Sequence, residues 1–324
     1  MPTQATKPPS TPLLLRSGNA NASYGSPMST PESPQQQSPP HHHERTLGAV
    51  AIAFLTFAQV AGSPVGIEDA VGAGGAFGCV ILLAMMAVLW AAPQALITAE
   101  LSTAFPVGGG AVVWVDEALG PVVGTANAWL VRVGALCDLP MYPLLFSQTV
   151  GSMWPALAGP VPSACLALAL LAASVAVNAC GAEAMAASTE WLTAIILVPF
   201  VAMPVVAAAY STPLNAGALG PAGVPQPLAL AALVSSVQWN MMGWGSVGAL
   251  AAEARDPGRS FPRGVLAAVA LVTAAYAWPV LWGFAVDADT ADWEDGTLPV
   301  VAGRIAPWLG SWMFASAALA GATG

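Results

Sequence analysis

Long apolar segments recur along most of the chain, separated by short stretches rich in glycine, proline and charged residues. Most of these segments are near the ~20 residues that a helix needs to cross a bilayer. The pattern predicts an all-α, multi-pass membrane protein with about eight spans. The expected spans are Leu47–Val71, Phe77–Ala104, Val122–Val150, Cys165–Asn178, Ala186–Tyr210, Leu228–Ala252, Val265–Val286 and Ile305–Ala320.

Two of these segments differ from the rest. Cys165–Asn178 is the shortest, so its helix is expected to include flanking residues. Ile305–Ala320 runs into the last residues of the chain, where the sequence shows no polar tail or charged anchor. We therefore expect the sequence to be truncated at its C-terminal side, within or after the eighth helix.

Residues 1–45 have no apolar periodicity and are rich in Pro, Ser, Thr, Gln and His. Their hydrophobicity is too low to offset the entropy of ordering, so we expect a disordered cytoplasmic tail before a transmembrane domain over residues 46–324. An organelle transit peptide is the open alternative, because the tail is serine-rich and poor in acids. His41, His42 and His43 have no further ligands nearby, and neither a metal site nor a cofactor is expected.

Composition agrees with a membrane protein: 56% of residues are hydrophobic, only 8% are charged, and the mean hydropathy is +0.68. The net charge of −9, from 17 acidic and 8 basic residues, argues against nucleic-acid binding. An intramembrane enzyme would need a nucleophile with a base, an aspartyl pair or a metal set inside the spans. The histidines lie only in the tail and no such set is apparent, so we do not expect an enzyme.

The basic residues predict the orientation, because Lys and Arg are retained on the cytoplasmic side of short loops. Lys7, Arg16 and Arg45 precede the first span, and Arg255, Arg259 and Arg263 follow the sixth. The acid-rich stretch 287–295 follows the seventh span, on the opposite face. The N-terminus is therefore expected in the cytosol.

Two of the expected spans carry residues that disfavour a continuous helix. The stretch "AGSPVGIED", Ala61–Asp69, places Gly62, Pro64 and Gly66 in the first span, and "SVQWNMMGWGSVG", Ser236–Gly248, places glycine and polar residues in the sixth. Unwound backbone at membrane depth is tolerated where it lines a cavity or finds protein partners. A kink that serves packing is the alternative for the first break alone.

Broken first and sixth helices match transporters built from inverted repeats, in which both unwind around a site at the middle of the membrane. The half-helix that resumes near Gly66 is expected to offer free N–H groups to a carboxylate or other acceptor. The half-helix before it offers carbonyl groups to an amine or cation.

Several motifs together make a family resemblance specific. They are "GSPVGIEDAVGAGG", "PQALITAELSTAFPVGGGAVVWVDEALGP", "DLPMYPLLF", "LTAIILVPFVAM" and "WNMMGWGSVGALAAEARDPGRSFPRG". The sequence resembles permeases of the amino acid–polyamine–organocation (APC) superfamily, and within it the plant-type polyamine uptake and L-type amino acid transporters. The resemblance implies a five-plus-five inverted-repeat transporter fold with two extra helices, of which the second repeat is incomplete here.

The resemblance also implies which residues contact the substrate and which carry protons. The implied substrate contacts are Ala61, Gly62, Ser63 and Gly66 in the first break, and Trp239, Asn240, Gly243 and Trp244 in the second. Glu68 and Asp69 match an acidic pair in similar sequences and are candidates for proton coupling or amine binding; an equal alternative places them in water at the outer mouth. Asp138 and Tyr142, four residues apart, are expected to share a helix face and to line the cavity or to bond each other.

Two positions depart from the family pattern. Gln94 and Gly245 stand where related sequences have acids, which leaves polyamine selectivity open and favours neutral or cationic amino acids more than the family alone does. At the cytoplasmic ends of the second and sixth spans, Glu100 and Glu253 are expected to pair with Arg255 or Arg259 as an inner gate; ordinary loop anchoring is the alternative.

These observations predict a secondary active transporter of the plasma membrane that imports polyamines or amino acids, with proton symport implied by the resemblance. Its expected partners are the small-molecule substrate, protons and the lipid bilayer. Two alternatives stay open: an amino acid permease without polyamine activity, and a nutrient sensor on the same fold that does not transport.

Overall fold

The computed structural model describes residues 45–64, 66–214, 227–287, 289 and 292–320. Residues 1–44, which hold nearly all of the expected tail, and residues 321–324 lie outside this part. The described elements are α1 (Ala49–Val60), α2 (Glu68–Met86), the π-helical turn η1 (Ala87–Ala91), α3 (Ala92–Ala104), α4 (Ala111–Leu119), α5 (Pro121–Asp138), α6 (Met141–Met153), the 3₁₀ turn η2 (Pro155–Leu157), α7 (Pro160–Ala179), α8 (Ala182–Ala209), α9 (Pro227–Asn240), the 3₁₀ helix η4 (Ser246–Glu253), α10 (Pro257–Val286), α11 (Thr297–Ile305) and α12 (Pro307–Ala320).

The expected all-α membrane architecture is confirmed. Within the described part, five stretches are long and apolar enough to cross a membrane: Glu68–Ala104, Pro121–Gly151, Pro160–Ala179, Ala187–Ala209 and Pro257–Val286. The shortest expected span, Cys165–Asn178, lies within α7. This helix begins at Pro160 and so includes flanking residues, as expected. Proline suits this position, since the first N–H of a helix has no intrahelical partner in any case.

Two short helices were not predicted. They are α4, after the glycine triplet that ends at Gly110, and α11, after Gly296. Each has nine residues, too few to span a membrane. The segments joining the second to the third span and the seventh to the eighth are therefore partly helical.

The first break is present where glycine and proline predicted it. Helix α1 ends at Val60, and helical structure resumes only at Glu68. Gly66 has φ of 105°, a conformation that a residue with a Cβ rarely adopts. Within α2, the backbone of Gly75 is not helical (φ 70°, ψ 162°), and this kink separates the second half of the first span from the second span.

The second break is also present. Helix α9 ends at Asn240, the chain turns over residues 241–245, and the tighter helix η4 follows from Ser246 to Glu253. Gly243 lies in the turn with φ of 95°. Both spans are thus interrupted, whereas the inverted-repeat relation between them stays a prediction.

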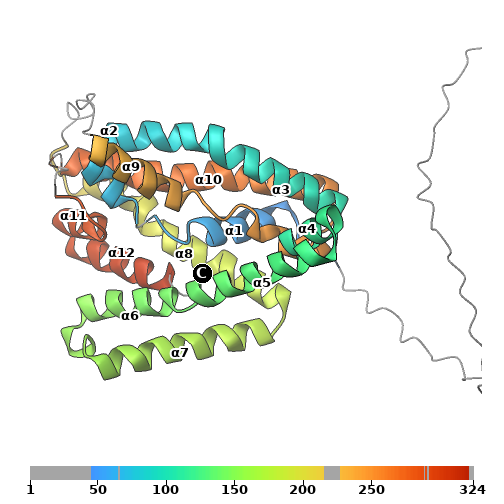
Figure 1. Ribbon diagram of the computed structural model, residues 1–324. Coiled ribbons are helices and arrows are strands. Elements are labelled where there is room, and N and C mark those ends of the chain that lie inside the picture. Colours follow the sequence, from blue (N-terminus) through green and yellow to red (C-terminus); the bar gives the residue numbers. More distant parts are fainter. Residues whose placement is uncertain (1–44, 65, 215–226, 288, 290–291, 321–324) are drawn as a thin grey trace, which may run out of the picture. The chain divides into compact units, whose positions relative to one another are not determined.

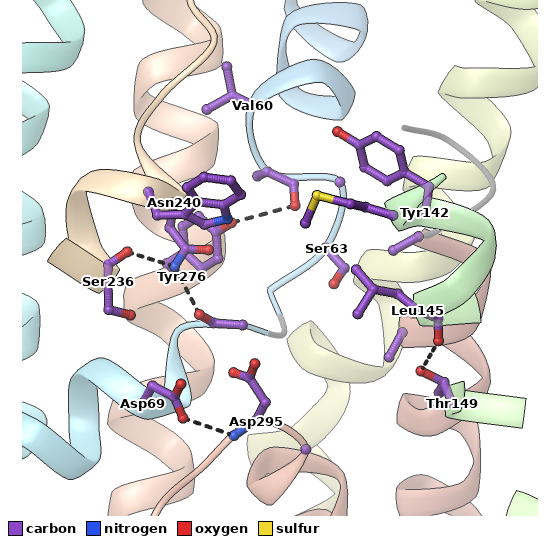
Figure 2. A pocket seen from close by; sticks show the side chains of 18 of the residues that line it. Val60, Ser63, Asp69, Tyr142, Leu145, Thr149, Ser236, Asn240, Tyr276 and Asp295 are labelled. Atoms are coloured by element: carbon purple, nitrogen blue, oxygen red, sulfur yellow. Dashed lines mark hydrogen bonds between the residues drawn. The ribbon is translucent and has the colours of Figure 1, made fainter. Parts of the chain in front are cut away.

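Asn240 connects the two breaks. Its side-chain amide donates one hydrogen bond to the carbonyl oxygen of Gly66 at 2.9 Å and another to that of Ser236 at 2.9 Å, as Figure 2 shows. The first bond joins the first break to the last turn of α9. A side chain at the end of one half-helix therefore satisfies a backbone group that the other break exposes.

Helix α1 lies near the centre of the view in Figure 1 and packs closely on α10 and α8. Ile52 and Phe57 of α1 are fully buried. Gly264 of α10 makes a particularly close approach, since a Cβ there would lie 2.6 Å from Cγ2 of Ile52 and 2.9 Å from the carbonyl oxygen of Ala49. This contact fixes the half-helix that leads into the first break.

Gly264→Ala is expected to destabilise the protein by about 1–3 kcal/mol, because the added methyl group overpacks the contact between α1 and α10. Thermal unfolding in detergent should show a lower Tm. Gly134→Ala on α5, where a Cβ meets nothing within 4 Å, is the matched control and should leave Tm unchanged or slightly raised. Equal Tm values for the two variants would contradict the proposed role of this packing.

Asn240→Leu is expected to loosen the first break, because the Gly66 carbonyl loses its side-chain donor. An unpaired buried polar group costs about 1–3 kcal/mol, so amide hydrogen exchange across residues 66–71 should accelerate. Gln238→Leu, an exposed position on the same helix, serves as control. Unchanged exchange in the Asn240 variant would show that this bond does not hold the two breaks together.

Candidate functional site

A cavity of about 1000 Å³ lies between the first break and the last turns of α9, which lead into the second break. Its walls come from α1 and the first break, α5 and α6, α9 and α10, and the segment from Asp295 through α12. The lining residues are Ala58, Gln59, Val60, Ala61, Gly62, Ser63, Gly66, Asp69, Asp138, Met141, Tyr142, Leu145, Gln148, Thr149, Ala232, Ser235, Ser236, Trp239, Asn240, Tyr276, Asp295, Gly296, Pro299, Phe314, Ala317 and Ala320.

Six of the eight expected substrate contacts line this cavity. They are Ala61, Gly62, Ser63, Gly66, Trp239 and Asn240. Figure 2 shows Asn240 and Tyr276 on one wall, Tyr142 and Leu145 of α6 on the other, and Ser63 of the first break between them. The structure therefore brings together residues that lie more than a hundred positions apart in the sequence.

The other two expected contacts, Gly243 and Trp244, do not line the cavity. Trp244 is fully buried, and its indole N–H donates to the carbonyl of Met241 at 2.9 Å. Gly243 packs against the end of α1, where a Cβ would lie 3.3 Å from the carbonyl oxygen of Gln59. Both residues shape the second break. Trp239, 63% exposed, is the tryptophan that reaches the cavity.

The N–H groups of the first break are already bonded within the protein. Those of Ala61 and Gly62 donate to the carbonyl of Phe57 at 2.8 and 3.2 Å, and that of Ser63 donates to the carbonyl of Ala61 at 2.5 Å. The N–H of Gly66 donates to a carboxylate oxygen of Glu68 at 2.6 Å. The expectation of free donors concerned the half-helix that resumes near Gly66. Of these four groups only the Gly66 N–H belongs to it, and its acceptor is a carboxylate of the protein itself.

The acidic pair at the start of α2 is divided between two environments. Glu68 is fully buried and does not line the cavity; one carboxylate oxygen binds Gly66, and the other has no hydrogen-bond partner among the described residues. Asp69 is exposed and lines the cavity. The two carboxylates thus lie in different environments, since successive helical residues point about 100° apart, and their roles in proton coupling or amine binding stay a prediction.

Asp138 and Tyr142 both line the cavity. They do not share one continuous helix, because α5 ends at Asp138 and α6 begins at Met141, after Pro140. Tyr142 faces the first break across the cavity in Figure 2. Both residues therefore line the cavity, which is one of the two expected alternatives. They do so from two successive helices and not from one face of a single helix.

Asp295 completes a set of three carboxylates on the cavity wall, with Asp69 and Asp138. Its backbone N–H donates to a carboxylate oxygen of Asp69 at 3.2 Å. Asp295 is exposed on one side, and its partial burial raises the pKa above its usual value, with the negative charges of Asp69 and Glu294 raising it further. None of the described residues that line the cavity is basic, so this lining is anionic.

The expected inner-gate pairing is not formed in this structure. Among the described residues the ion pairs are Arg259 with Asp256, at 3.9 Å, and Arg304 with Asp287, at 2.5 Å. Neither joins Glu100 or Glu253 to Arg255 or Arg259, because Asp256 lies one turn from Arg259 at the start of α10.

Backbone pairing closes this end of the sixth span. The N–H of Leu47 donates to the carbonyl of Glu253 at 3.0 Å, and the N–H of Arg255 donates to the carbonyl of Leu47 at 2.8 Å. Leu47 is itself buried. The entry into α1 is thus attached to the end of η4 without a salt bridge.

The sequence did not single out several further polar lining residues, among them Tyr276, Gln148 and Asp295. Tyr276 is nearly fully buried in α10, and its hydroxyl lies 3.5 Å from the carbonyl oxygen of Ala61. A lone tyrosine in an otherwise apolar span was a usable signal. Asp295 belongs to the acid-rich stretch 287–295, from which only the orientation of the chain was predicted.

Comparison with known proteins adds independent evidence. The family model described as amino acid permease matches residues 47–320. The chain is 36% identical over 277 residues to the polyamine transporter PUT1 of Oryza sativa subsp. japonica and 32% identical over 278 residues to the polyamine transporter RMV1 of Arabidopsis thaliana. Each alignment covers 85% of this chain but only 51% and 56% of the relative.

A more distant match is an uncharacterized transporter of Mycobacterium tuberculosis, 29% identical over 252 residues, with 74% of this chain and 52% of the relative covered. The chain thus spans about half the length of the curated relatives it matches. The family model, in contrast, covers most of the chain, including both helix breaks. The chain therefore belongs to the amino acid permease family of the APC superfamily.

Proposed function

We propose that the whole protein is a secondary active transporter that imports polyamines across the plasma membrane together with protons. One observation carries the choice of substrate: among the described residues, the cavity at the first break presents three carboxylates and no basic side chain. The names of the plant relatives, which are polyamine transporters, support the same choice.

The hydrogen bonds of the first break favour an amine over an amino acid. Of the N–H groups at the first break, those of Ala61, Gly62, Ser63 and Gly66 already have acceptors, which leaves fewer donors for the carboxylate of an amino acid. Asp69, Asp138 and Asp295 repel a second negative charge. A polyamine carries ammonium groups and no carboxylate. Trp239 adds an exposed aromatic ring on which a cation can stack.

Transport in this proposal follows alternating access around the two breaks. The half-helices on either side of each break are short, so each can tilt without unwinding the rest of the bundle. With the N-terminus in the cytosol, the acid-rich stretch that includes Asp295 faces the outside, where it concentrates polycations before they enter the cavity.

The substrate is tested by competition against labelled putrescine uptake by the whole protein in a yeast strain that lacks its own polyamine import. Putrescine and spermidine are expected to compete at least about tenfold more strongly than neutral or basic amino acids, which corresponds to about 1.4 kcal/mol. Stronger competition by amino acids would instead favour an amino acid permease. Binding without any uptake would indicate a sensor.

Proton symport requires separate places for the proton and the amine, because an ammonium group bound to a carboxylate displaces its proton. Glu68 and Asp69 meet this requirement. Glu68 is fully buried outside the cavity, and one of its carboxylate oxygens has no hydrogen-bond partner within the described part of the chain, whereas Asp69 lies on the cavity wall. We assign the proton to Glu68 and the amine to Asp69.

Glu68→Gln is expected to keep putrescine binding within about threefold, because a glutamine carbonyl can still accept the N–H of Gly66. The same variant should lose accumulation driven by an inward proton gradient, since Gln cannot exchange a proton. Measurements are equilibrium binding and putrescine uptake into proteoliposomes with and without an imposed pH gradient.

Glu117→Gln, an exposed position on α4, is the matched control and should behave as the wild type. The groups whose charges interact with Glu68 are Asp295, Tyr276 and Cys79, and none of them is altered in either variant. Gradient-driven accumulation that persisted in Glu68→Gln would reject this assignment of the proton.

A further inference from the structure

We propose that Asp295 and Asp69 form a subsite for the second ammonium group of a diamine or polyamine, so that this pair selects polycations over monoamines. The inference rests on the proposed function and deepens it. It assigns a specificity-determining role to Asp295, which lies far from both helix breaks in the sequence.

The first support is the position of the pair. Asp69 and Asp295 lie together at one end of the cavity in Figure 2, joined by the bond from the Asp295 N–H to the Asp69 carboxylate at 3.2 Å. Asp138, the third carboxylate of the lining, comes from a different element, the end of α5. A ligand with one ammonium group cannot satisfy both places at once, whereas an extended diamine can.

The second support is that Asp295 is held in place by its own turn. The N–H of Glu294 donates to the hydroxyl of Thr297 at 3.0 Å, and the N–H of Thr297 donates to the carbonyl of Glu294 at 3.0 Å. Trp293, 5% exposed, packs close to Gly283 of α10, where a Cβ would lie 2.9 Å from its ring. The Asp295 carboxylate is therefore preorganised, which lowers the cost of binding a cation.

The third support is an unpaired buried group beside the pair. Glu68 is fully buried, and one of its carboxylate oxygens has no hydrogen-bond partner among the described residues. Its other oxygen accepts the N–H of Gly66, which lines the cavity, although Glu68 itself does not. Glu68 and Asp295 interact electrostatically. A bound cation compensates this concentration of carboxyl groups.

The raised pKa of Asp295, caused by burial and then by Asp69 and Glu294, is consistent with uncompensated negative charge at this end. An ammonium group binds the ionised carboxylate, so its binding should weaken as the pH falls through that raised pKa. The other acid in electrostatic contact with this group is Glu68.

The test compares two competitors of the same four-carbon chain, putrescine with two ammonium groups and n-butylamine with one, in uptake of labelled putrescine by the whole protein. In Asp295→Asn the inhibition constant of putrescine is expected to rise about tenfold, as for loss of a hydrogen bond to a charged group, while that of n-butylamine changes less than about twofold. Asp292→Asn, an exposed acid of the same segment that does not line the cavity, should change neither.

Each outcome decides the question. If Asp295→Asn raised both inhibition constants by the same factor, Asp295 would attract amines in general, and the proposal would be overturned. No change in either constant would overturn it too. Asp295→Glu, which keeps the charge, should retain most of the preference for putrescine, and thermal unfolding verifies that the variants fold. Absence of putrescine uptake by the wild type would refute the proposed function itself. Failure of the further proposal is a different result: the wild type takes up putrescine, but Asp295→Asn leaves the ratio of the two inhibition constants unchanged.

Discussion

The structure depends on how an interrupted membrane helix satisfies its own backbone. Water is absent from the bilayer core, so an unwound peptide must find partners inside the protein. Gly66 shows both halves of this requirement: its N–H is bonded to Glu68 and its carbonyl to Asn240. These two bonds join the first break to the start of α2 and to the end of α9. Gly66 and Asn240, the two residues joined across the breaks, both line the cavity.

The choice of partners for the break has an electrostatic consequence. A helix N-terminus with free N–H groups and a positive dipole end attracts anions. Here the first turn of α2 begins with Glu68 and Asp69, and the N–H of Gly66 already has a carboxylate acceptor. The protein thereby supplies its own anion at this helix end. What remains for a ligand is carboxylate and aromatic surface, which suits a cation.

Local sequence signals were sufficient for the helix breaks and most span boundaries. Gly62, Pro64 and Gly66 act through backbone conformation, and the structure interrupts the helix at those residues. The same signals cannot tell which side chain faces the cavity. Trp239 and Trp244 looked equivalent in the sequence, yet the turn at Gly243 leaves the first exposed in the cavity and buries the second. The nine-residue helices α4 and α11 were missed because they are shorter than the window a span requires.

Residues that meet only through tertiary packing were the hardest to predict. Asp295 reaches Asp69 across more than two hundred residues, and no periodicity or motif connects them. The inner-gate pairing stays a prediction. In this structure Arg259 pairs with Asp256, three residues away at the start of α10, and not with Glu100 or Glu253.

The division of labour proposed for Glu68 and Asp69 follows from helix geometry at the break. Adjacent helical residues point about 100° apart, so two consecutive acids at a helix start can face the protein interior and the cavity respectively. A single carboxylate serving both ligands would bind either a proton or an amine and would exchange one for the other. Two carboxylates one residue apart permit both to be bound in the same state, which symport requires. In the proposed mechanism, the half-helix that carries both carboxylates moves both ligands together.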